Sequence, residues 1–268
     1  MLRKIKIITS VVFVLWLSGC AQTSVRHHQD FEQVAKTVDS VVIIPADVQI
    51  ELINFDGDNE ILDDKADTIR DQIHSLASSR MQQENLNVVE FDFAAEIESN
   101  DDFAYAITTA KEAWTKSKED MYKLGLVPEK DKAQFQTSLG SVLNTIADRT
   151  GADAALLVYY NGFEKSSGMV AKDVASSILV GVLTMGAVVP VQATEGSFID
   201  VALVDTITGK VIWANRKIGP SVDIGALEVA FNELPDLTWK SEIVNEPVTA
   251  QEADAVVTET TSESPDAQ

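Results

Sequence analysis

The strongest constraint on the fold is a stretch of period-two alternation in the C-terminal third of the chain. Residues 197–205 (SFIDVALVD) and 210–215 (KVIWAN) are rich in β-branched and aromatic side chains, and the short segment 206–209 (TITG) between them ends in glycine. The alternation predicts two strands, and the short glycine-ended link predicts that they pair. We therefore expect an antiparallel β-hairpin over residues 197–215.

Further strands are expected upstream of this hairpin. The β-branched run SVVIIPADVQIEL within residues 39–52 is typical of a buried first strand. Pro45 lies inside the run, and proline lacks the backbone N–H that a ladder needs, so the strand either ends there or lies at a sheet edge. Residues 87–91 predict a short strand, and residues 154–160 (AALLVYY) predict a strong one.

Segments with helical spacing of apolar residues separate these strands. Helices are expected from Asp63 or Asp64 to Glu84, from Asp101 or Asp102 to Leu124, from Lys132 to Thr150, and from Val222 to Leu234. The aspartates are expected to cap the first two helices. Gly151 is expected to end the third in a left-handed conformation.

The order of these elements is β-α-β-α-α-β, then an apolar stretch, then β-β-α. This order combines crossover connections with a hairpin. It predicts an α/β fold: a three-layer or two-layer sandwich with a mixed sheet and a C-terminal β-hairpin, flanked by disordered ends.

The N-terminus has the organisation of a secretory signal peptide. Three basic residues among the first six precede an apolar run over residues 7–17, which is too short to cross a bilayer. The sequence Leu-Ser-Gly-Cys that ends at Cys20 resembles the bacterial lipobox closely. That resemblance implies cleavage before Cys20, a diacylglycerol on its thiol and an acylated new amino terminus.

The residue after the lipobox implies the compartment. In sorted lipoproteins an aspartate at this position usually retains the protein in the inner membrane, and here the residue is Ala21. We therefore expect a lipid anchor in the outer membrane of a Gram-negative bacterium, facing the periplasm. Cys20 is the only cysteine, so the mature chain can have no internal disulfide.

The ends of the chain are expected to frame one domain. Residues 1–19 are the expected signal peptide, 20–37 the lipidated cysteine and tether, 38–240 the α/β domain, and 241–268 an acidic disordered tail. Removing residues 1–19 takes three positive charges and no negative ones from a net charge of −21, which leaves −24. So acidic a chain is not expected to bind nucleic acid.

The uncharged stretch 174–194 (VASSILVGVLTMGAVVPVQAT) allows three interpretations. It can be a buried helix followed by a strand or loop, an element that contacts the membrane or another copy of the chain, or a membrane span. Polar side chains, glycines and Pro190 argue against a membrane span, because glycine and proline weaken a continuous helix. The candidate interface residues are Gly181, Val182, Leu183 and Gly186.

The sequence contains no recognisable catalytic motif. The chain has three histidines, His27, His28 and His74, and its one cysteine belongs to the lipobox. Histidine-dependent triads and common zinc sites therefore lack their bases and ligands, and there is no glycine-rich phosphate loop. Acid–base catalysis by a pair of carboxylates stays an open alternative, because acidic residues are abundant. We expect no metal, no cofactor and no catalytic residue.

Two motifs carry a family resemblance. Gly-Ala-Asp-Ala at 151–154 leads into a strand, and Val204 to Trp213 (VDTITGKVIW) forms the predicted hairpin. Together with the lipobox, they resemble envelope lipoproteins with an α/β domain like that of the curli secretion channel subunit and the amino-terminal domain of the Tol translocation protein. Penicillin-binding-protein activator lipoproteins and uncharacterised periplasmic lipoproteins look similar.

The matched residues are structural ones. Gly209 is expected to supply a positive φ, Asp205 and Thr208 to hydrogen-bond within the turn, and Trp213 to pack in the core. None of them has a catalytic role in those families.

These observations predict a non-enzymatic lipoprotein that acts in envelope assembly, secretion or export through protein contacts. Its expected partners are the membrane, through the anchor, and periplasmic or outer-membrane proteins, including further copies of this chain. The alternative is a monomeric adaptor or regulator of a cell-wall enzyme. A carboxylate-dependent wall hydrolase is the remote alternative.

Overall fold

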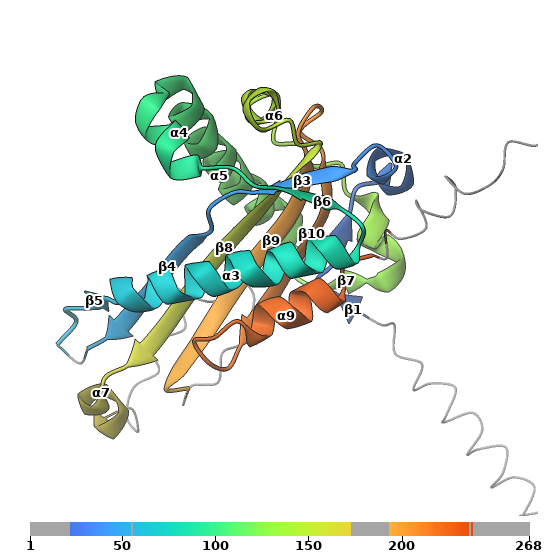
Figure 1. The fold of residues 1–268 in the computed structure, drawn as a ribbon. Coiled ribbons are helices and arrows are strands. Elements are labelled where there is room, and N and C mark those ends of the chain that lie inside the picture. The colour runs from blue at the N-terminus through green and yellow to red at the C-terminus, as the bar shows by residue number, and fades with distance from the viewer. Residues whose placement is uncertain (1–21, 55, 173–192, 236, 238–268) are drawn as a thin grey trace, which may run out of the picture. The chain divides into compact units, whose positions relative to one another are not determined.

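The computed structural model describes residues 22–54, 56–172, 193–235 and 237 (Figure 1). The signal peptide, Cys20, most of the uncharged stretch and the acidic tail lie outside these residues. Within the described part of the chain, no helix is both long and apolar enough to cross a membrane.

Three long strands form the centre of the sheet. β8 (Ala154–Lys165), β9 (Glu195–Asp205) and β10 (Val211–Gly219) lie side by side in that order, and both pairs are antiparallel. β9 and β10 are the predicted hairpin. A β-bulge shifts their register between Val211 and Trp213, and both Ile212 and Trp213 pack into the same core.

The other neighbours of β8 are parallel to it. β3 (Ser40–Ile43) pairs with the start of β8, and β4 (Asp47–Ile53) pairs with its end. The two strands are separated at Pro45, which confirms that this proline ends a strand. Outside them, β6 (Asn87–Val89) is parallel to β3 and β5 (Glu60–Ile61) is antiparallel to β4. The sheet is therefore mixed, as predicted.

Helices cover both faces of this sheet (Figure 1). α3 (Asp63–Gln83) and α9 (Gly225–Asn232) pack on one face, and α5 (Asp101–Tyr122) and α6 (Leu143–Thr150) pack on the other. Successive side chains of β8 alternate between the two cores, as the pleat requires. The short α7 (Ser167–Lys172) follows β8. The α/β prediction is confirmed in its three-layer form.

The N-terminal segment differs from the expected tether. β1 (Gln22–Thr23) pairs with β7 (Val127–Pro128), and β2 (Arg26–His27) pairs with β10 at one edge of the main sheet. α2 (Phe31–Ala35) follows. Because these elements are paired and packed, the folded domain begins at Gln22, and the expectation of a tether over 20–37 is corrected from residue 22 onward.

The predicted helices keep their apolar faces but not all of their ends. The aspartates expected to cap α3 and α5 lie in the first turns instead. The cap of α5 is Asn100, whose side chain accepts a hydrogen bond from the backbone N–H of Phe103. The preceding helix, α4 (Phe93–Ser99), is not among the predicted helices. Gly151 ends α6 with φ 70°, as expected.

The single helix predicted over residues 132–150 is wrong in its first half. A 3₁₀ helix, η1 (Glu129–Gln134), comes first, and only α6 follows as an α-helix. Between them the chain runs beside the hairpin turn, where the N–H of Leu139 donates to the carbonyl of Gly209 at 2.8 Å. Gly140 then has φ 81°, which interrupts helical backbone.

Candidate functional site

A buried ion cluster joins α5 to the hairpin. Asp200 on β9 is fully buried and lies opposite Arg216 on β10. Arg216 binds both carboxylate oxygens, at 2.6 Å through Nε and 3.2 Å through Nη2. Lys118 of α5 places Nζ 3.2 Å from the same carboxylate. One carboxylate therefore holds two cations from two layers of the sandwich.

Aromatic rings surround these cations. The ammonium of Lys118 lies 3.5 Å from the ring centroid of Tyr159. The guanidinium of Arg216 lies 4.1 Å from the ring centroid of Tyr122 and 4.8 Å from that of Phe198. Such contacts stabilise cations that have lost their water. The cluster is therefore a desolvated cation–aromatic stack and not an open binding site.

A third buried cation, Arg26, extends the stack to the N-terminal segment. Its side chain donates to the carbonyls of Thr23, Met121 and Gly125, and its guanidinium lies 4.9 Å from the ring centroid of Tyr122. With the carbonyl of Val25, four backbone carbonyls from two distant segments thus converge on one side chain. Arg26 fastens β1 to the turn that follows α5.

Burial dominates the electrostatics of this cluster. It lowers the pKa of Lys118, and the Asp200 carboxylate opposes that shift. Burial also raises the pKa of Tyr122, whose hydroxyl has no hydrogen-bond partner among the described residues. Because the Asp200 oxygens already bind Arg216 and Lys118, this carboxylate is not free to act as a general base. The arrangement serves to lock α5 onto the sheet.

A groove of about 450 Å³ lies beside the cluster and is lined by α5 and by Asp47 at the start of β4. Its lining carries charges of both signs: Asp47, Lys111, Glu112, Lys116 and Glu119, with threonines between them. Burial lowers the pKa of Lys111, against the opposing effect of Asp47. A lining of mixed charge suits contact with another polar surface better than it suits an apolar small molecule.

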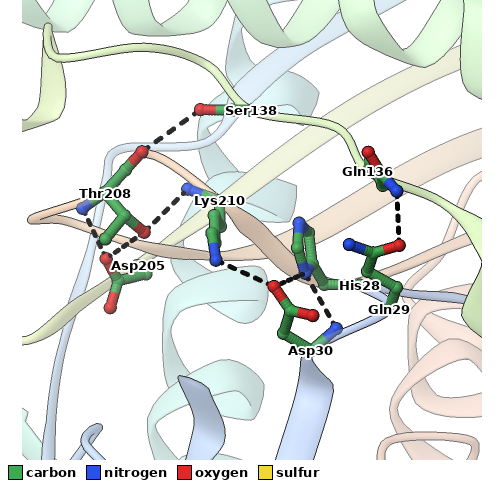
Figure 2. A network of polar contacts seen from close by, with 8 residues as sticks. All are labelled: His28, Gln29, Asp30, Gln136, Ser138, Asp205, Thr208 and Lys210. Carbon is green, nitrogen blue, oxygen red and sulfur yellow. Dashed lines mark hydrogen bonds and ion pairs between the residues drawn. The ribbon is translucent and has the colours of Figure 1, made fainter. Parts of the chain in front are cut away.

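The hairpin turn is a structural network, shown in Figure 2. Asp205 accepts hydrogen bonds from the backbone N–H and the hydroxyl of Thr208, both at 2.6 Å. Gly209 has φ 68°, and the hydroxyl of Ser138 donates to the carbonyl of Thr208. Trp213 is fully buried. These contacts confirm the roles expected of the turn residues.

The same network holds the N-terminal segment (Figure 2). Lys210 on the hairpin binds the carboxylate of Asp30 at 3.0 Å, and Nδ1 of His28 accepts the backbone N–H of Asp30 at 3.1 Å. His27 instead stacks on Phe31, with ring centroids 4.7 Å apart. The two adjacent histidines therefore serve separate packing contacts.

The remaining predicted site residues cannot be placed. Cys20 and the candidate interface residues Gly181, Val182, Leu183 and Gly186 lie outside the described residues. Among the described residues, no group of three or more histidine, cysteine, aspartate or glutamate side chains could hold a metal ion.

The ion cluster is not among the predicted sites, although the sequence contains a signal for it. Asp200 interrupts the apolar run of its strand, and Lys118 follows Trp114 by four residues on the apolar face of its helix. A charged residue at a core position of a strand and another at a core position of a helix are candidates for a buried pair. Arg26 carries no such signal, because its surroundings show no regular period.

No family model matches the sequence, and no curated protein matches it significantly. Among solved structures, the chain is similar to the LpoB C-terminal domain from Salmonella enterica. The two share 13% sequence identity over 72% of this chain and 94% of that chain, with a TM-score of 0.26. At this TM-score the similarity carries no argument about fold or function. The resemblance to the envelope lipoproteins named above stays a prediction.

Proposed function

We propose that this chain is a lipid-anchored, non-enzymatic protein of the periplasmic face of the outer membrane, which works through contacts with other envelope proteins. The observation that carries this proposal is the lipobox ending at Cys20, placed directly before a folded domain that begins at Gln22. The anchor and the domain are thus separated by Ala21 alone.

The chemistry of the described residues supports a non-enzymatic role. The most buried carboxylate, Asp200, is held by Arg216 and Lys118, and His28 accepts a backbone hydrogen bond through Nδ1. A general base needs a free lone pair that faces substrate. The lone pairs of Asp200 and His28 already accept internal contacts. This weighs against a wall hydrolase that uses either residue as its base.

The short connection also bears on the adaptor alternative. One intervening residue allows at most about 7 Å between the Cα atoms of Cys20 and Gln22. A domain held this closely contacts partners within its own diameter of the membrane, which disfavours an adaptor that must reach an inner-membrane enzyme. Partners at the outer membrane, including further copies of the chain, fit this geometry better.

The test is the chemical state and location of the mature amino terminus. Mass spectrometry of the N-terminal peptide from the natural host is expected to show a Cys20 that carries acyl chains, in outer-membrane fractions. Cys20→Ser is the matched control and is expected to give no acylated peptide. An unprocessed Met1, or an acylated chain confined to the inner membrane, would contradict the proposal.

A further inference from the structure

Two leucines stand out on the described surface because of where they lie. Leu124 is 81% exposed and Leu126 is 57% exposed, and only Gly125 separates them. Scattered exposed leucines are normal on soluble proteins. These two form one apolar tip, in the turn between α5 and β7.

This leucine tip is adjacent to the expected lipid anchor. β7 pairs with β1, and Gln22 is the register partner of Pro128, two residues after Leu126. Cys20 in turn lies two residues before Gln22. β1 and β7 lie side by side in Figure 1, so the tip lies near Gln22, the first described residue, which follows Cys20 by two positions.

The tip is also held in place. Arg26 donates to the carbonyls of Met121 and Gly125 on one side and of Thr23 on the other. Gly125 has φ 68°, a conformation that fixes the direction of the turn. A rigid turn presents Leu124 and Leu126 without the entropy cost of ordering a free loop.

From this juxtaposition we propose that the leucine tip inserts into the interface of the bilayer that carries the Cys20 anchor, and so fixes the orientation of the domain on the membrane. The inference rests on the proposed lipid anchor. Exposed leucines gain by leaving water for the acyl boundary. Lys123, exposed at the start of the same turn, can keep its ammonium at the headgroups while its stem lies along the apolar region.

The sole natural cysteine is blocked by acylation in this account, so an engineered thiol reports on one position. The mature acylated chain carrying Leu126→Cys is labelled with an environment-sensitive fluorophore and reconstituted in phosphatidylethanolamine–phosphatidylglycerol vesicles with brominated acyl chains. Ile61→Cys is the matched control, because Ile61 is also exposed but lies on β5, far from β1 and β7 in Figure 1. Flotation of the vesicles measures anchoring independently.

The expected result is a blue shift and loss of emission at position 126 and neither change at position 61. If the protein floats but the label at position 126 stays as exposed to water as the label at position 61, the tip does not contact the membrane. That result would overturn the tip contact and would still support the lipid anchor. A blue shift without quenching by the bromines would mean that a protein surface covers the tip, which also overturns it. Protein that fails to float would overturn the anchor and the contact together.

Discussion

Replacing Asp200 with asparagine is expected to cost far more stability than the loss of one ion pair at the surface. The change keeps the size of the side chain, so it leaves no cavity. It removes the one carboxylate that binds both Arg216 and Lys118, whose side chains are only 10% and 4% exposed. Two buried cations then lie close to each other without the carboxylate that binds both of them.

The magnitude follows from that burial. Removing one partner of a buried ion pair typically costs about 3–5 kcal/mol, because the other charge stays desolvated. A domain of this kind unfolds at a cost of about 5–15 kcal/mol. Asp200→Asn is therefore expected to remove a large part of the free energy of unfolding, measured by urea denaturation followed by circular dichroism.

Two further variants make this measurement decisive. Glu164→Gln breaks the half-exposed pair with Lys65 and is expected to cost about 1 kcal/mol or less. Lys118→Met combined with Asp200→Asn removes one of the stranded cations. The double variant is expected to lose less than the sum of its two single changes, by about 0.5–3 kcal/mol. A cost for Asp200→Asn no larger than that of Glu164→Gln would refute the reasoning.

Other regions give predictions that use the same unfolding assay or a simple mass measurement. Gly151→Ala is expected to cost about 1–2 kcal/mol, for the left-handed backbone alone. Gly209→Ala should cost clearly more stability than Gly151→Ala, because its Cβ would lie 2.2 Å from the carbonyl oxygen of Gly140. Equal costs for the two variants would show that the loop around Gly140 can move away from the new methyl group. Burial, aided by Lys132, lowers the pKa of His27 from 6.5 to about 4, so the neutral form is the one that the fold favours. The stability this adds is full above pH 6.5 and is lost as the pH falls toward 4, and His27→Gln should remove that part of the pH dependence; parallel pH curves for the two proteins would contradict it. If the uncharged stretch is an interface, light scattering of residues 21–268 is expected to show an oligomer, and Val182→Glu is expected to convert this oligomer to a folded monomer. If the Val182→Glu variant unfolds instead, the stretch belongs to the core.

The parts of the fold that the sequence predicts are those with a long regular period. The alternation over 197–215 extends through two strands and a turn, so burial of one face fixes both the strand type and the pairing. Pro45 ends a strand because of its own missing N–H, and Gly151 ends a helix because of its own backbone freedom. Each of these outcomes depends on local chemistry that a single sequence displays.

The missed parts depend on partners that are distant in the sequence. β1 and β2 have two residues each, too short to show any period. The ordered state of this segment depends on Arg26, whose partners at Met121 and Gly125 are almost a hundred residues away. Likewise, the apolar spacing before α6 is helical, yet hydrogen bonds to the hairpin turn hold that segment extended. Tertiary contacts outweigh local propensity in both places.

The central claim, that this protein works through contacts with other envelope proteins, is tested most directly by site-specific photocrosslinking in living cells. A photoreactive amino acid at Glu119, in the groove beside α5, reports on that surface, and the same group at the exposed Gln72 of α3 reports on the opposite face of the sheet. The account predicts discrete crosslinked species that depend on an intact Cys20 and are stronger from at least one of these faces. Acylated protein that stays monomeric from both positions, and from the candidate interface at Val182, would contradict it.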